Sequence, residues 1–166
     1  DAAQDALPRA AAAGVPAVEL KVFEAWLELA RDPASQPSPL PVAALPLLGV
    51  ILETLLGRHE FETFERLAGL LLRSPLSRRE QREILASMYL KYGFLASAAQ
   101  EWMAVCEAQA DGRALLGLAQ VAAAQGELED AAVFATEALR HDPNNPAARD
   151  ILARRSGARE AVPAGL

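Results

Sequence analysis

His59 and His141 are the only histidines of the sequence, and histidine is the side chain best suited to bind a metal ion or to transfer a proton near neutral pH. They lie about 80 residues apart, at the predicted ends of helices, and neither belongs to a metal-binding motif. At the C-terminal end of a helix, His141 would also interact favourably with the helix dipole. We therefore expect neither histidine to be catalytic or to bind a metal.

Three carboxylates, Glu127, Glu129 and Asp130, are the candidates for acid–base chemistry. Such chemistry needs surroundings that separate the pKa values of two carboxyl groups. These residues instead open a predicted helix, where negative charge stabilises the exposed backbone amides. Their predicted role is structural.

Cys106 is the only cysteine, so it cannot form an intrachain disulfide or a cysteine-based metal site. It shares the apolar side of a predicted helix with Trp102 and Val105, which favours a buried small residue over a nucleophile. The sequence also contains no glycine-rich phosphate loop and no nucleophile elbow. We expect no enzymatic activity and no cofactor, and a reducing compartment such as the cytoplasm.

The composition predicts an all-α protein. Apolar residues make up 52% of the chain and aromatic residues only 5%, so alanine and leucine must fill most of the core. Both residues have high helix propensity, and no long segment alternates polar and apolar residues as a half-buried strand would.

The net charge of −6 argues against a general nucleic-acid-binding protein. Arginines cluster at 78–82 and 149–155, but acidic residues interrupt both clusters, which favours solvated helix faces. The most apolar segment, 42–56, is too short to span a membrane and contains Pro46 and Glu53. The chain shows no signal peptide, and its start at Asp1 suggests a fragment of a longer protein.

The pattern of prolines and apolar residues divides the chain into parts. A broad apolar stripe predicts a helix at 17–31 that must pack against other helices. The proline-rich segment that follows could be a ligand for a proline-binding domain, but a stiff linker is the simpler interpretation. The expected parts are an N-terminal helical segment at 1–31, a linker at 32–41, a helical array at 42–155 and a frayed tail at 156–166. Helices are expected within the array at 43–57, 60–73, 77–92, 95–109, 112–125, 128–141 and 146–155.

Two helix pairs of the array repeat at a spacing of 33 residues, since the segment from Tyr92 to Ala99 aligns with that from Gln125 to Ala132. Gly93 and Gly126 lie where each first helix should end, because glycine readily adopts the left-handed turn required there. Ala98 and Ala131 then lie on the inner face of each second helix, opposite Ala86 and Ala119, where two backbones must approach closely. This spacing indicates stacked helix hairpins.

The segment from Leu115 to Asn145 resembles one tetratricopeptide repeat (TPR), with its turn glycine, its small second-helix alanines and its closing Asp-Pro-Asn-Asn. The preceding repeat is less regular: Trp102 matches a bulky position, but the closing proline is absent. The pair at 43–73 is less similar again, because Leu52 and Phe64 stand where small residues are expected. The resemblance implies a right-handed superhelical stack of antiparallel helix hairpins.

The resemblance also implies a concave groove that is lined by the first helix of each pair and binds a partner protein or peptide. Leu116 and Gln120 replace the basic and asparagine residues with which some members of the family hold a terminal carboxylate, so an apolar or amphipathic helix or an extended segment is the expected ligand. The helix at 17–31 could itself fill the groove of its own chain or of another copy. We expect the groove residues to be exposed and outside the core. They are Ser87, Leu90, Lys91, Arg113, Leu116, Gln120 and Ala123, with Glu83 and Ala124 beside them.

Two functions remain open. The first is a protein-interaction or scaffolding module that binds a protein or peptide, with no nucleic acid and no membrane insertion, and that could form homo-oligomers. The second is an accessory domain of a larger enzyme, for example a bacterial glycosyltransferase, that positions substrate or mediates dimerisation.

Overall fold

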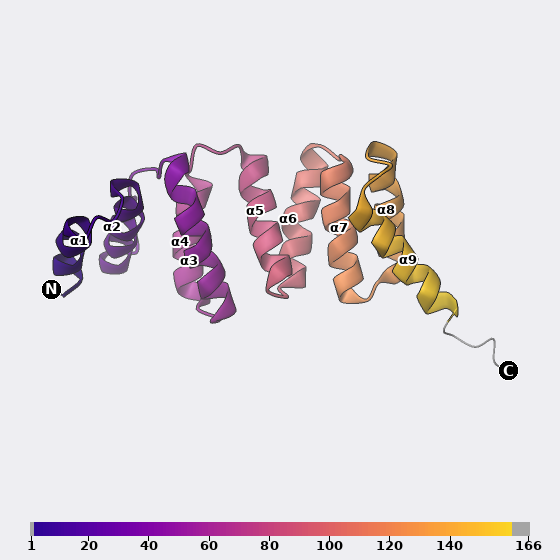
Figure 1. Ribbon diagram of the computed structural model, residues 1–166, viewed down its shortest axis with the longest axis horizontal. Coiled ribbons are helices and arrows are strands. Elements are labelled where there is room, and N and C mark those ends of the chain that lie inside the picture. Colours follow the sequence, from indigo (N-terminus) through magenta and orange to yellow (C-terminus); the bar gives the residue numbers. More distant parts are fainter. Residues whose placement is uncertain (1, 161–166) are drawn as a thin grey trace. The chain divides into compact units, whose positions relative to one another are not determined.

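The computed structural model describes residues 2–160, with side chains described for residues 7–156 (Figure 1). Every regular element within residues 2–160 is helical, so the all-α prediction is confirmed. The chain forms two compact units, residues 1–81 and 82–166, and the division falls within α5 (Arg78–Lys91). The N-terminal helices, the proline-rich segment and the first helix pair of the array thus belong to one unit.

The N-terminal unit contains a helix that the sequence predicts to the residue, α2 (Ala17–Arg31). Val22, Ala25 and Leu29 are buried at spacings of three and four residues, which place them on one face of the helix. The other helical elements before α5 are α1 (Ala2–Ala12), the 3-10 helix η1 (Val42–Ala44), α3 (Leu45–Gly57) and α4 (Phe61–Leu72).

Large side chains fill the core of the α3–α4 pair. Leu48, Leu52 and Leu56 of α3 and Phe64 and Leu67 of α4 are all buried. Leu52 and Phe64, which the sequence comparison places where the later pairs carry small alanines, are among these buried residues. Large side chains therefore fill the space between α3 and α4, whereas small alanines lie between the helices of the later pairs.

The C-terminal unit continues from α5 with helices close to the predicted ones: α6 (Leu95–Ala108), α7 (Gly112–Gln125), α8 (Leu128–His141) and α9 (Pro146–Glu160). Gly93 and Gly126 have φ values of 80° and 83°, so both glycines adopt the left-handed conformation expected of them. The four alanines that the repeat places at helix contacts, Ala86, Ala98, Ala119 and Ala131, are completely buried.

Two hydrophobic clusters hold this unit together. The first joins α5, α6 and α7 around Trp102, and the second joins α7, α8 and α9 around Ala135 and Ile151. Helix α7 contributes to both clusters, so side chains on more than one of its faces are buried.

Hydrogen-bonding side chains fix where the last helices begin. The Asp111 side chain accepts hydrogen bonds from the backbone N–H of Arg113 and Ala114 at the start of α7. The Asn145 side chain accepts one from the N–H of Ala148 at 3.1 Å and so caps the start of α9. Helix α9 continues to Glu160 and therefore includes the first part of the expected tail, whose residues 161–166 lie outside the described part of the chain.

Candidate binding cleft

The seven residues of the predicted groove all belong to the C-terminal unit, on α5 and α7. Ser87, Lys91 and Arg113 are exposed. The other four, Leu90, Leu116, Gln120 and Ala123, are half-buried.

The two leucines do not lie outside the core, contrary to expectation. Leu90 packs against the cluster of α5, α6 and α7, and Leu116 packs against the cluster of α7, α8 and α9. Helix α7 packs against α6, α8 and α9, so its apolar residues spread around more than one face. Both leucines therefore contribute to stability.

Glu83 is also not exposed, because only 5% of its surface is accessible. Its carboxylate pairs with Nε of Arg113 at 3.0 Å, and this ion pair connects α5 to α7. Ser87, one turn further along α5, donates a hydrogen bond from its hydroxyl to the backbone carbonyl of Glu83 at 2.8 Å. The Arg113 side chain itself remains 74% exposed. Its guanidinium therefore pairs with a buried carboxylate while most of the Arg113 side chain faces solvent.

A cleft of about 230 Å³ opens between α7 and α9. From α7 it is lined by Gln120, Ala123 and Ala124, three of the residues that the sequence assigns to the groove side of this helix. From α9 it is lined by Ala147, Asp150, Ile151 and Arg154. Successive members of this set are three, one and three residues apart, so they form one face of α9. This spacing is the sequence signal that could have identified them.

The cleft combines small apolar side chains with few polar groups. The Asp150 carboxylate accepts a hydrogen bond from Arg154 at 2.6 Å, one turn away on α9, and both side chains are more than half exposed. The Gln120 amide is the remaining polar group of the lining. These groups can orient a bound chain through hydrogen bonds, and the alanines allow its close approach.

The candidate chemical residues lie apart from this cleft. His59 lies in the turn between α3 and α4, where its ring contacts the edge of Phe61, and His141 is the exposed last residue of α8. Cys106 is half-buried and packs against the cluster around Trp102. Glu129 forms an ion pair with Arg155 of α9. Within the described residues, no group of three or more histidines, cysteines or carboxylates is placed to hold a metal ion.

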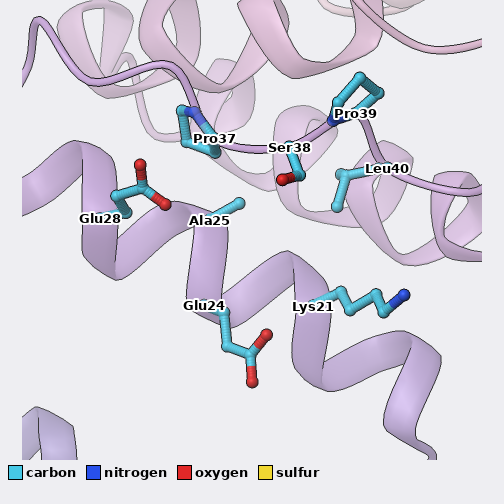
Figure 2. A pocket seen from close by; sticks show the side chains of 8 residues that line it. All are labelled: Lys21, Glu24, Ala25, Glu28, Pro37, Ser38, Pro39 and Leu40. Atoms are coloured by element: carbon cyan, nitrogen blue, oxygen red, sulfur yellow. The ribbon is translucent and has the colours of Figure 1, made fainter.

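A second hollow, of about 290 Å³, lies in the N-terminal unit between α2 and the proline-rich segment (Figure 2). Pro37 and Leu40 of this segment are buried. The segment therefore packs against α2 and also separates α2 from η1. In Figure 2, Ala25 points from α2 toward the segment and Leu40 points back toward the helix. Lys21, Glu24 and Glu28 line the hollow from α2.

Comparisons with protein-family models, with curated proteins and with solved structures found no match to this chain. Among the described helices, none combines the length and the apolar character needed to cross a lipid bilayer.

Proposed function

We propose that the chain is a protein-interaction module of the TPR type, and that the cleft between α7 and α9 holds a peptide or a helix of a partner protein. The observation that carries this proposal is the lining of the cleft. Alanines from two helices face the same space, and the helix that supplies Gln120, Ala123 and Ala124 is the first helix of the most regular repeat.

The sequence supports the same role. The 33-residue repeat, its left-handed turn glycines and its completely buried alanines describe helix pairs that cover one another's apolar faces. In such arrays the surface that no neighbour covers is available to a ligand. The cleft is such a surface.

The size and the side chains of the cleft support a protein or peptide ligand. A volume of about 230 Å³ accommodates a few side chains of a larger ligand, whereas pockets that enclose small molecules usually measure about 300–1,000 Å³. The lining offers an amide, an ion pair and aliphatic groups.

The proposal is tested with a displayed peptide library and a pair of matched variants. Peptides are selected for binding to the wild-type chain and then measured against Ala124→Trp, which places an indole in the cleft. The control is Ala108→Trp, the same change at an exposed alanine of α6. Both alanines are exposed, so both variants should keep the melting temperature of the wild type.

We expect the selected peptides to lose binding to Ala124→Trp and to keep it with Ala108→Trp. Peptides that bind both variants equally well would show that the partner uses another surface. Failure to select any peptide whose binding depends on Ala124 would refute the assignment of the cleft.

A further inference from the structure

Helix α3 of the N-terminal unit exposes an uncharged and largely apolar face. Apart from Gly57 at its end, its exposed residues are Pro46, Val50 and Thr54, which recur every four residues and form one stripe along the helix. Val50 is 62% exposed, although valine is an apolar residue. Val42 of η1 is 56% exposed and extends the stripe by four residues.

The composition of α3 makes this exposure unusual. The helix contains only two polar residues, Glu53 and Thr54, and a helix that is apolar on all sides is normally buried on all sides. Every other α-helix with described side chains exposes at least one charged residue, as α4 does with Glu62 and Glu65. No charged residue occurs in the sequence between Asp32 and Glu53. The face of α3 therefore has the character of a contact surface.

The stripe also offers no free hydrogen-bonding group. The hydroxyl of Thr54 donates a hydrogen bond to the backbone carbonyl of Val50 at 2.7 Å, within the same helix. Interfaces between different proteins use charged and polar groups to fix the register and to reject wrong partners. A face that lacks such groups is poorly suited to select a foreign protein.

A lipid surface is also a poor match for this face. Apolar helix faces that lie on membranes are accompanied by lysine and arginine residues on the polar side. The charged residues that flank the uncharged segment are Asp32 and Glu53, and both are acidic.

A second copy of the chain fits the face better. Two copies related by a two-fold axis meet through the same surface, so residues near the axis lie close to their own equivalents. The chain carries a net charge of −6, and among the described α-helices only α3 has an exposed face that can meet itself without opposing charges. Contact between two such faces removes apolar surface from water.

We infer that α3 packs against α3 of a second copy, in an antiparallel pair centred between Pro46 and Val50. In this arrangement the two copies of Glu53 lie roughly 15 Å apart along the helix axis, at opposite ends of the contact. The two copies of Val50 lie roughly 6 Å apart along the same axis. This dimer does not depend on the binding cleft between α7 and α9.

The test compares Val50→Asp with Val133→Asp. Val133 of α8 is 60% exposed, so the control places the same charge at a similarly exposed valine of the C-terminal unit. A single helix face is small for a stable interface, in which each partner usually buries about 800 Å², so the dimer should dissociate measurably on dilution. Sedimentation equilibrium of the full chain, from about 5 to 500 µM, should show dimers of the wild type and of Val133→Asp. Val50→Asp should associate at least about tenfold more weakly, with an unchanged melting temperature.

Opposite charges at residue 50 test whether the partner is a second copy. Val50→Lys alone should be as monomeric as Val50→Asp, because like charges then face each other near the axis. An equal mixture of the two variants should form heterodimers, because opposite charges then face each other. A cysteine variant gives a measurement that introduces no charge. With Cys106, the only cysteine, replaced by serine, Val50→Cys should form a disulfide-linked dimer on treatment with diamide, and Val133→Cys should not.

Three outcomes would overturn the dimer. The first is a wild-type chain that stays monomeric at about 500 µM. The second is an equal dimerisation of Val50→Asp and the wild type, or a mixture of Val50→Asp and Val50→Lys that forms no heterodimer. The third is a monomeric wild type that binds phosphatidylcholine vesicles while Val50→Asp does not, which would assign the face to lipid. The cleft is tested separately through Ala124, so failure of the dimer leaves the proposed function in place.

Discussion

Replacement of Gly117 by alanine tests a close contact between two helices of the C-terminal unit. Gly117 lies in α7 against the indole of Trp102 from α6, and a methyl group built on Gly117 would lie 2.3 Å from the indole carbons Cδ2 and Cε2. Trp102 is only 4% exposed, so its ring is enclosed and cannot move into solvent. The variant must therefore separate the two helices or displace the ring.

The expected loss of stability comes from two opposing effects. Overpacking a closely packed core costs about 1–3 kcal/mol. Replacing glycine by alanine inside a helix returns up to about 1 kcal/mol, because alanine has the higher helix propensity. Since 2.3 Å is far inside any normal carbon–carbon contact, the steric effect should dominate, and we expect Gly117→Ala to lower the free energy of unfolding by about 1–2 kcal/mol.

Gly69→Ala is the matched control. Gly69 is also inside a helix, α4, but a methyl group there would meet only the end of the Arg73 side chain, at 4.0 Å. Only the propensity effect remains, so this variant should be more stable than the wild type by about 0.5–1 kcal/mol. The same chemical change should therefore have opposite signs at the two positions.

Urea unfolding measures both changes. Circular dichroism follows the helices of both variants, and in a Trp26→Phe background the emission of Trp102, then the only tryptophan, follows the C-terminal unit. For a slope of about 2 kcal/mol per molar urea, the midpoint of Gly117→Ala should fall by roughly 0.5–1 M. A midpoint equal to or above that of the wild type would refute the contact between Gly117 and Trp102.

Three further predictions concern the same unit. Ala98→Leu and Ala131→Leu should each lower the free energy of unfolding by about 1–3 kcal/mol, because there is no room for added carbons at completely buried alanines. Ala124 is exposed, so Ala124→Leu should change the free energy of unfolding little. Equal melting temperatures for all three variants would contradict the repeat register. Leu116→Asp should destabilise the unit by roughly 2–4 kcal/mol, since the Leu116 side chain packs on the cluster of α7, α8 and α9. An unchanged melting curve would mean that Leu116 lies outside the core, as the groove prediction expected. Asn145→Ala should cost about 1 kcal/mol through loss of the helix cap, measured by the melting temperature, and full stability would mean that the cap hydrogen bond is not formed in solution.

The sequence predicted the helices well because local signals were strong. The ends of α2, α7 and α8 agree with prediction to the residue, and they coincide with proline, glycine and acidic residues that restrict the backbone or its hydrogen bonds. The 33-residue spacing located Ala98 and Ala131 because only small residues fit where two helices touch. Each of these signals acts over a few residues or at a regular spacing.

The burial of polar and apolar side chains on the first helices was harder to predict. Glu83 is buried because it pairs with Arg113, thirty positions later, and no local pattern indicates that pairing. Leu90 and Leu116 were expected in the groove because family resemblance assigns one face of each first helix to ligand, whereas both leucines pack against the hydrophobic clusters. The packing of Pro37 and Leu40 on α2 likewise depends on how the chain returns after the helix, which composition does not specify.

The alanines of α7 show most clearly why the cleft could be predicted only in part. Ala119 and Ala122 are buried in the hydrophobic clusters, Ala123 is half-buried and Ala124 is exposed, although all four side chains are identical. Side-chain size, which identified the helix contacts, therefore cannot separate core from binding surface along this helix. The distinction comes from α9, whose Ala148 and Ile151 share a hydrophobic cluster with Ala119 and Ala122, whereas the cleft opens beside Ala123 and Ala124. It follows that changes on α9, such as those at the Asp150–Arg154 pair, alter the proposed binding surface without touching the repeat that forms its other wall.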